Sequence, residues 1–252
     1  MQKHILIFLM MAQALALTAQ RAEPDRFTTS EGDLLIQPII HGTLAFTWKG
    51  KTVYVDPYGG AKAFEGIAPP DLILITDIHG DHLNLETLAA IDVSKAMLLA
   101  PRAVVEMLPY PLKVKATSLA NGQSATIMGL QVAALPMYNL PEAPDSRHPK
   151  GRGNGYVVTL ADKKLYFSGD TEDIPEMRSL KGIDVAFVCM NQPFTMDIHQ
   201  AASAVLAFKP NVVYPYHYRG QGRLSDVDAF KKTVDAEQAG IEVRLRNWYP
   251  NY

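Results

Sequence analysis

The sequence predicts an α/β fold in which two β-sheets pack face to face and helices cover their outer sides. Three observations lead to this expectation. The chain has 252 residues, of which 48% are apolar and 20% are charged, so it can bury a full globular core. From residue 34 onward, short β-type runs alternate with helical runs. The pattern occurs twice, and each half opens with strands before strands and helices alternate, which suits two sheets with helices outside.

The first half is predicted to begin with a strand meander that turns at Gly50-Lys51. A nearly continuous apolar run at 71–76 predicts a buried strand, and Asn84 is expected to cap the helix that follows. The predicted elements of this half are strands at 34–40, 44–48, 52–56, 71–76 and 97–100 and helices at 84–91 and 102–108.

The second half is predicted to contain two hairpins, one turning near Gly129 and the other at Ala161-Asp162. Residues 138–154 are rich in Pro, Gly and charge, and they predict a loop long enough to be either functional or disordered. The predicted elements are strands at 125–128, 130–135, 155–160, 164–168, 185–189, 212–216 and 242–245 and helices at 198–209 and 225–239. No Pro/Ser linker divides the halves, so we expect one domain over 20–252.

Residues 1–19 have the layout of a secretory signal peptide. Lys3 gives a short positive start, residues 5–17 are apolar apart from Gln13, and 17–19 offer a small-residue cleavage site. The apolar run is shorter than the ~20 residues that a membrane-spanning helix needs. We therefore expect cleavage, a periplasmic or secreted protein and no stable membrane insertion afterwards. The alternatives are an uncleaved anchor and a buried core helix.

The charge balance gives no electrostatic case for a nucleic-acid partner. The chain has 24 Lys and Arg against 26 Asp and Glu, a net charge of −2, and shows no basic stripe. The single cysteine, Cys189, excludes an internal disulfide and a Cys-rich zinc module. A small molecule is the partner that we expect, and the sequence leaves the oligomeric state open.

The strongest chemical feature is the segment 76–82, which places four potential metal ligands directly after a predicted buried strand. These are Asp77, His79, Asp81 and His82. In an extended segment the first three point to one side, and a turn at Gly80 lets the last two both point inward. One short loop could therefore serve two adjacent ions. The alternative is a solvated polar turn.

Three further candidates follow downstream. His148 lies in the long predicted loop, Asp170 follows the strand at 164–168, and His217 follows the strand at 212–216. Singly, an Asp in a turn or a His at the surface is usually structural. Together with the first loop, these residues indicate a folded metal site.

This order of residues resembles the metallo-β-lactamase superfamily: Asp-x-His-x-Asp-His, a loop His, Gly-Asp-Thr after a strand, and a late His. Within it, the chain looks most like the branch of ascorbate-phosphate lactonases and of phospholipase-D-type enzymes that act on acylated ethanolamine lipids. The supporting stretches are Val55-Asp56-Pro57, Pro136-Met137-Tyr138-Asn139, His148-Pro149-Lys150-Gly151 and Gly155-Tyr156-Val157. The resemblance runs from residue 36 to the C-terminus and implies a four-layer αββα sandwich with the site on one edge.

The resemblance also implies how two ions are held. One is expected at positions 77, 79 and 148, the other at Asp81, His82 and His217, with Asp170 bridging them and Asp81 also catalytic. A water or hydroxide between the ions would then be the nucleophile. Zinc is expected, but Asp77 stands where the family usually has His, and the added oxygen ligand favours manganese or iron. Alternatively, Asp77 turns away and supports a neighbouring ligand.

Several other residues keep two interpretations. Asp56 either hydrogen-bonds the metal loop or ends a strand. His41 either lines the site or packs elsewhere, and His199 either contacts substrate or only begins a helix. The pair Tyr138-Asn139 could approach the metals in place of His148. The loop cations Lys150, Arg152 and Arg219 either attract an anionic group or are solvated.

The leading hypothesis is an exported metal-dependent hydrolase that cleaves an ester, lactone or phosphodiester. One alternative is an iron-dependent redox enzyme of the same superfamily, which bound iron with a visible absorption band and oxygen consumption would reveal. Another is a non-catalytic metal- or ligand-binding protein, which would bind without turnover. The substrate itself depends on loop shapes that the sequence does not give.

Overall fold

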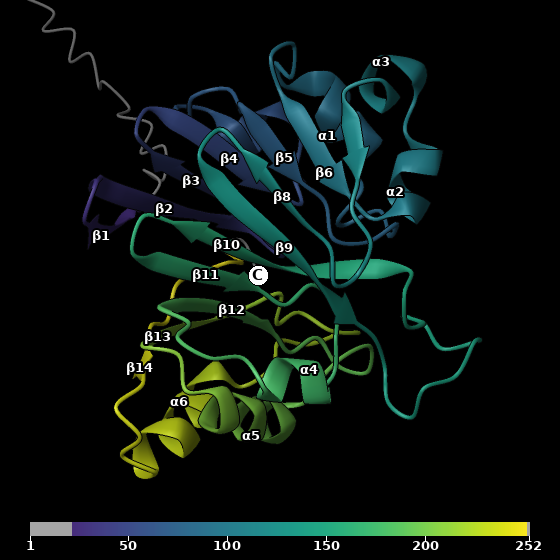
Figure 1. Cartoon of the computed structure of the whole chain (residues 1–252). Coiled ribbons are helices and arrows are strands. Elements are labelled where there is room, and N and C mark those ends of the chain that lie inside the picture. Colours follow the sequence, from purple (N-terminus) through teal and green to yellow (C-terminus); the bar gives the residue numbers. More distant parts are fainter. Residues whose placement is uncertain (1–21, 251–252) are drawn as a thin grey trace, which may run out of the picture.

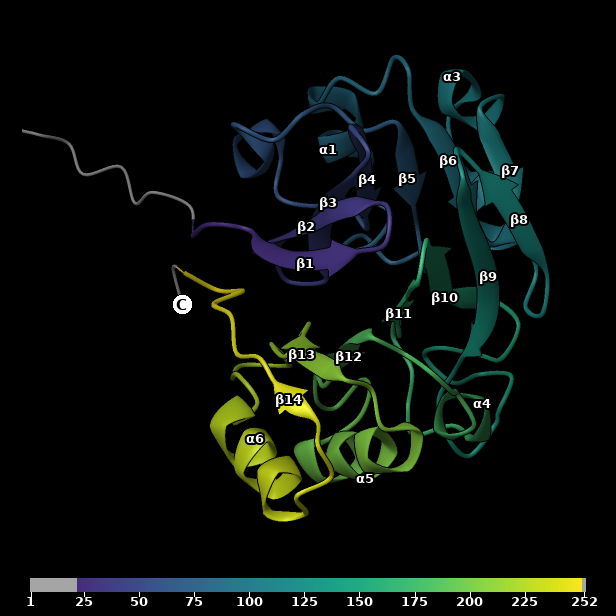
Figure 2. The same cartoon turned by 60° about the vertical axis from the view of Figure 1, so that its left-hand side comes forward.

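The structure, a computed structural model, describes residues 22–250. Within this range two seven-stranded sheets face each other, and helices cover the outer side of each (Figures 1 and 2). This is the four-layer αββα sandwich that the sequence predicted. The proposed signal peptide at 1–19 lies outside the described residues.

The first sheet has the order β1-β2-β3-β4-β5-β6-β7. Strands β1 to β4 form an antiparallel meander, whereas β4 to β7 run parallel and are joined by crossovers. The strands are β1 Asp25–Thr29, β2 Gly32–Ile40, β3 Thr43–Trp48, β4 Lys51–Val55, β5 Leu72–Leu74, β6 Met97–Ala100 and β7 Ala116–Ser118.

The second sheet repeats this plan with the order β14-β13-β12-β11-β10-β9-β8. Strands β8 to β11 are antiparallel, and β11 to β14 are parallel. The strands are β8 Ser124–Ile127, β9 Leu130–Met137, β10 Gly153–Leu160, β11 Lys163–Phe167, β12 Val185–Cys189, β13 Val212–Tyr216 and β14 Glu242–Val243.

The helices lie outside the sheets (Figure 2). The first half contributes η1 Ala61–Phe64, α1 Leu85–Ala90, α2 Arg102–Met107 and α3 Tyr110–Lys113, and the second half contributes α4 Pro175–Arg178, α5 Ile198–Phe208 and α6 Val227–Ala236. Asn84 caps α1 as predicted, because its side chain accepts a hydrogen bond from the Thr87 backbone N–H. Asp197 and Gln200 form a capping box at the start of α5. In the described residues, no helix is both long and apolar enough to span a bilayer.

The main core fills the space between the sheets and continues under α5 and α6. Phe46 of the first sheet and Phe167 of the second stack with ring centroids 6.0 Å apart. A smaller cluster packs the outer face of the first sheet, including Ile73 and Leu98, against Leu88 of α1 and Val104 of α2. Because strands buried on both faces are apolar throughout, the central parallel strands β5, β6, β12 and β13 could be recognised in the sequence.

The sequence missed the elements that lack an apolar run. Strands β1 and β7 are sheet edges with partly polar sequences, Asp-Arg-Phe-Thr-Thr and Ala-Thr-Ser. Helices α3 and α4 have only four residues each and carry Pro in their first turn. The buried strand predicted at 71–76 is shorter in the structure, where β5 ends at Leu74 and leads directly into the predicted metal loop.

Candidate metal centre

The site lies where the carboxyl ends of parallel strands from both sheets meet. The loop after β5 carries Asp77 to His82, and the loop between β9 and β10 carries His148. Asp170 follows β11, and His217 directly follows β13. Ligand sites of α/β sheets commonly form at this edge, because several loops converge there. The structure thus brings together all seven residues singled out in the sequence.

Asp170 is the centre of the tighter of two groups. One oxygen, Oδ2, lies 3.3 Å from His82 Nε2 and 3.2 Å from His148 Nε2, and the other lies 3.3 Å from His217 Nε2. His82 Nε2 and His217 Nε2 are themselves 3.3 Å apart. The side chains of His82, His148, Asp170 and His217 are at most 4% exposed.

The second group adjoins the first through His148 and contains Asp77 and His79. His79 Nδ1 lies 2.8 Å from Asp77 Oδ2, and His148 Nε2 lies 4.0 Å from the same oxygen. One potential ligand atom from each of these residues falls within 4.8 Å of the others, as it does for His82, Asp170 and His217. The two groups therefore offer two adjacent ion positions.

Hydrogen bonds behind the imidazoles orient their free nitrogens toward the centre. His82 Nδ1 donates to Asp56 Oδ2 at 2.8 Å, and His148 Nδ1 donates to Asn139 Oδ1 at 3.0 Å. Because carboxylate and amide oxygens only accept, each Nδ1 carries a proton, and Nε2 is the atom that each ring would offer to a metal. Burial lowers the pKa of His82, but Asp170, Asp56 and Asp81 outweigh it and hold that pKa well above its usual value, so a metal would bind His82 in exchange for its Nε2 proton. Asp56 thus has the supporting role foreseen for it, and Asn139 holds His148 rather than replacing it.

Buried atoms without hydrogen bonds show that the residues fit a cation. His148 Nε2 and Asp170 Oδ1 are buried and make no hydrogen bond, although each lies within 3.3 Å of another polar atom of the cluster. Such groups are costly to bury unless something satisfies them. Imidazole nitrogens and carboxylate oxygens that converge in this way match the ligands of zinc, manganese or iron.

The carboxyl groups are held in the ionised form that a cation requires. Burial raises the pKa of Asp170, but His217 and His82 outweigh it and hold that pKa well below its usual range. The pKa of Asp81 is lowered by the same two imidazoles against the effect of burial. Burial also opposes ionisation of Asp77, yet its pKa is lowered by neighbouring side chains.

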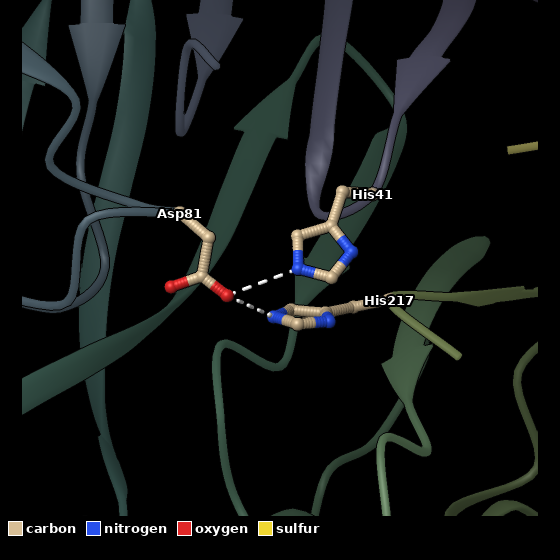
Figure 3. Close-up of side chains that lie close together, drawn as sticks. All are labelled: His41, Asp81 and His217. Carbon is tan, nitrogen blue, oxygen red and sulfur yellow. Dashed lines mark hydrogen bonds and ion pairs between the residues drawn. The ribbon is translucent and has the colours of Figure 1, made fainter. Parts of the chain in front are cut away.

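His41 lies in the turn between β2 and β3 and faces the centre. Of its two interpretations, the structure therefore supports the one in which it lines the site. Its Nε2 lies 3.0 Å from Asp81 Oδ2, and the same oxygen lies 3.4 Å from His217 Nε2 (Figure 3). Its Nδ1 lies 2.6 Å from the hydroxyl of Tyr249. Burial, together with the nearby His217, lowers the pKa of His41 to about 4, so the ring is neutral near pH 7. A neutral ring that donates from Nε2 to Asp81 accepts at Nδ1 from Tyr249.

We expect His41→Ala to weaken metal binding by about 10- to 100-fold, because residues that orient a metal ligand typically contribute that much. The variant frees Asp81 Oδ2 and leaves the Tyr249 hydroxyl without its buried acceptor. Titration of the metal-free protein with Zn²⁺ in a calorimeter measures the effect. Tyr249→Phe keeps His41 and removes the hydroxyl that contacts its Nδ1 and accepts from the Arg219 backbone N–H, so it should lose less affinity. Wild-type affinity in His41→Ala would contradict the orienting role.

Backbone strain is concentrated around the same edge. His41, Asp56 and His217 all have positive φ angles, of 58°, 44° and 45°. Non-glycine residues in this region cost of order 1–3 kcal/mol each, and they persist where the surroundings enforce them. Here the strained turns aim the imidazoles of His41 and His217 at the centre and place the Asp56 carboxylate behind His82.

The centre opens to solvent on one side. Among the proposed ligands, Asp81 is 33% exposed and His79 is 23% exposed, whereas the others are almost fully buried. The neighbouring side chain of Arg152 is 20% exposed. Arg152 was left open between two interpretations, and it contacts Asp77 directly.

Other residues considered in the sequence lie apart from the centre. His199 is exposed near the start of α5 and lines a surface groove with Arg178 and Ser203. Tyr138 donates its hydroxyl to Glu176, and Lys150 pairs with Glu142 and Glu176. Cys189 is buried in the core.

Comparison with known proteins agrees with this fold. The sequence pattern of the β-lactamase superfamily domain matches residues 36–217. The chain therefore belongs to the β-lactamase superfamily. A UPF0173 metal-dependent hydrolase of Pyrococcus abyssi is 31% identical over 204 residues, which cover 77% of this chain and 89% of that relative. A similarly named protein of Pyrococcus horikoshii is 32% identical with the same coverage.

Solved structures show the same architecture. A protein of Parabacteroides distasonis, proposed to be a metal-dependent hydrolase, has a TM-score of 0.80 and 36% identity and covers 90% of this chain and 99% of its own. A metallo hydrolase from Ignicoccus hospitalis has a TM-score of 0.69 and 23% identity and covers 84% of this chain and 94% of its own. At that identity the likeness concerns the fold alone.

Proposed function

We propose that this protein is a metal-dependent hydrolase that cleaves an ester, lactone or phosphodiester bond in a small molecule. The observation that carries the proposal is the convergence of seven Asp and His side chains on one open edge of the sandwich. The names of the relatives support the reaction class, since those from the two Pyrococcus species are called metal-dependent hydrolases.

Two divalent ions would occupy the site. Asp77, His79 and His148 would hold one, and Asp81, His82 and His217 the other, with Asp170 between them. Zinc suits the imidazoles, whereas the three carboxylates also suit manganese or iron. Bound ions would lower the pKa of a water molecule and stabilise negative charge on the attacked group.

The protein's own groups would position the substrate and the attacking water. Asp81 is the most exposed of the three carboxylates, and its Oδ2 is fixed by His41. Because its lowered pKa keeps it ionised, Asp81 is suited to a catalytic role in which its other oxygen, Oδ1, accepts a hydrogen bond from the attacking water and orients it. Arg152, partly exposed on the same side, would repel cationic substrates and attract anionic ones.

The N-terminal segment supports a further part of the proposal, namely that the protein is exported. A positive start, an apolar run and a small-residue cleavage site at 17–19 favour removal of residues 1–19 and a periplasmic or secreted mature enzyme. Determination of the N-terminal residue of the natively produced protein tests this part. A mature chain that still begins at Met1 would refute cleavage.

Removal of metal is the direct test of the proposed reaction. Activity is measured against panels of esters, lactones, phosphodiesters and β-lactams, first as purified, then after chelation, and then after addition of Zn²⁺, Mn²⁺ or Fe²⁺. We expect turnover in one panel to fall at least about 100-fold on chelation and to return with one of the metals. A protein that contains bound metal but turns over no substrate in any panel would favour a binding role instead.

A further inference from the structure

One of the proposed ion positions already contains a positively charged side chain. Arg152 Nε donates to Asp77 Oδ1 at 3.1 Å, and its Nη2 donates to Asp77 Oδ2 at 2.9 Å. This is the two-pronged geometry in which a guanidinium binds a carboxylate most strongly. Asp77 is fully buried, and the contact spans 75 residues of sequence.

Asp77 Oδ2 also has a second neighbour besides the guanidinium. His79 Nδ1 lies 2.8 Å from it, and His79 Nε2 lies 3.5 Å from Arg152 Nη2. Both carboxylate oxygens are therefore occupied within the protein. An ion that used Asp77 as a ligand would have to share this buried carboxylate with, or displace, the guanidinium of Arg152.

The other position lacks such a counter-charge. The ion pairs that the structure shows for Asp81 and Asp170 are all with imidazoles, and no Lys or Arg among residues 22–250 pairs with either. Asp170 Oδ1 makes no hydrogen bond. Asp81 and Asp170 thus face this position without a Lys or Arg counter-charge, whereas at the first position Asp77 is neutralised by Arg152 and only the shared Asp170 remains. A divalent cation prefers the more negative position.

We propose that the Asp77–Arg152 ion pair makes the two ion positions unequal. One ion is held tightly by Asp81, His82, Asp170 and His217, and the position beside His79 and His148 fills only at much higher metal concentration. Arg152 takes over the role of a cation at Asp77, and its remaining exposed surface stays at the mouth of the site. The inference rests on the proposed metal centre and concerns how many ions it holds tightly.

Metal titration of three metal-free proteins tests the inference without any substrate. Wild type, Arg152→Gln and Asp77→Asn are titrated with Zn²⁺ by calorimetry and with Co²⁺ by visible spectroscopy, and bound metal is counted after gel filtration. We expect wild type to bind one ion tightly and a second at least ~100-fold more weakly. Arg152→Gln frees Asp77 and should strengthen the second site at least ~10-fold. Asp77→Asn, which keeps the size of the side chain, should leave the tight ion within about threefold of wild type.

Lys150→Gln is the matched control, because it removes the same charge from the same loop while its partners are Glu142 and Glu176. Its two affinities should equal those of wild type. Two equally tight ions in wild type, an unchanged second site in Arg152→Gln, or loss of the tight ion in Asp77→Asn would overturn the inference. Absence of any tight ion in wild type would overturn the proposed function as well, so the two failures can be told apart.

Discussion

Asp170→Asn should abolish tight metal binding and lower hydrolytic activity by well over 100-fold. Asp170 is the residue that the imidazoles of His82, His148 and His217 all approach within 3.3 Å. The substitution keeps the shape but removes a negative charge and one of two acceptor oxygens. Since residues that only support a ligand contribute about 10- to 100-fold to metal affinity, loss of a shared ligand should cost more. Bound metal per protein and turnover of the best panel substrate measure the effect.

Asp173→Asn provides the matched control for this variant. Asp173 lies three positions further along the chain, is mostly buried, and pairs with Arg178 rather than with the centre. We expect it to retain its metal and most of its activity. If Asp170→Asn retained wild-type metal content, the convergence of imidazoles on this carboxylate would not mark a metal site.

The ligands could be found in the sequence because the chemistry is local. Four of them occur within six residues after one strand, and Asp170 and His217 directly follow apolar runs. Parallel strands end at a common edge, so residues placed there must meet once the sheets form. The same reasoning gave the central parallel strands β12 and β13, whose sequences are almost wholly apolar, but not the parallel edge strand β7.

The supporting residues could not be found in this way, because nothing local marks their partners. His41 and Tyr249 are 208 residues apart in sequence, and Arg152 lies 75 residues from Asp77. Tyr249 was not singled out at all. Only the fold brings Tyr249 to the centre, because the C-terminal segment runs back to the first sheet. There the backbone N–H of His41 donates to the Trp248 carbonyl.

Asp56 receives three buried hydrogen bonds, so we expect its substitution to have a large effect on stability. Thr76 donates its backbone N–H to Oδ1 at 2.7 Å and its hydroxyl to Oδ2 at 2.6 Å, and His82 Nδ1 donates to Oδ2 at 2.8 Å. Asp56→Ala removes the acceptor of all three donors in the core, where only the Thr76 hydroxyl and His82 Nδ1, 3.0 Å apart, could still pair with each other. Each unpaired donor costs about 1–3 kcal/mol, so we expect the free energy of unfolding to fall by several kcal/mol. Denaturant unfolding of the metal-free protein measures it.

Asp56→Asn separates stability from metal binding. An amide has one accepting oxygen and one donating nitrogen, so it cannot accept from Thr76 N–H and from His82 Nδ1 at the same time. If the oxygen faces Thr76, the amide N–H groups face His82. They favour the tautomer with the proton on Nε2, and that nitrogen then has no lone pair with which to bind the metal. We therefore expect about a 10- to 100-fold loss of metal affinity with a smaller loss of stability than in Asp56→Ala.

The tautomer itself is observable, because nitrogen chemical shifts of labelled histidine distinguish Nδ1–H from Nε2–H. In metal-loaded wild type His82 should carry a single ring proton, on Nδ1, whereas in Asp56→Asn it should carry a proton on Nε2. Asp71→Asn is the control, since Asp71 lies next to the start of β5 and, like Asp56, accepts from a backbone N–H, that of Thr52, but pairs with Lys51 and Lys95 away from the centre. If Asp56→Asn binds metal as tightly as Asp71→Asn does, Asp56 does not determine which nitrogen of His82 carries the proton. The orientation of His82 would then not depend on Asp56.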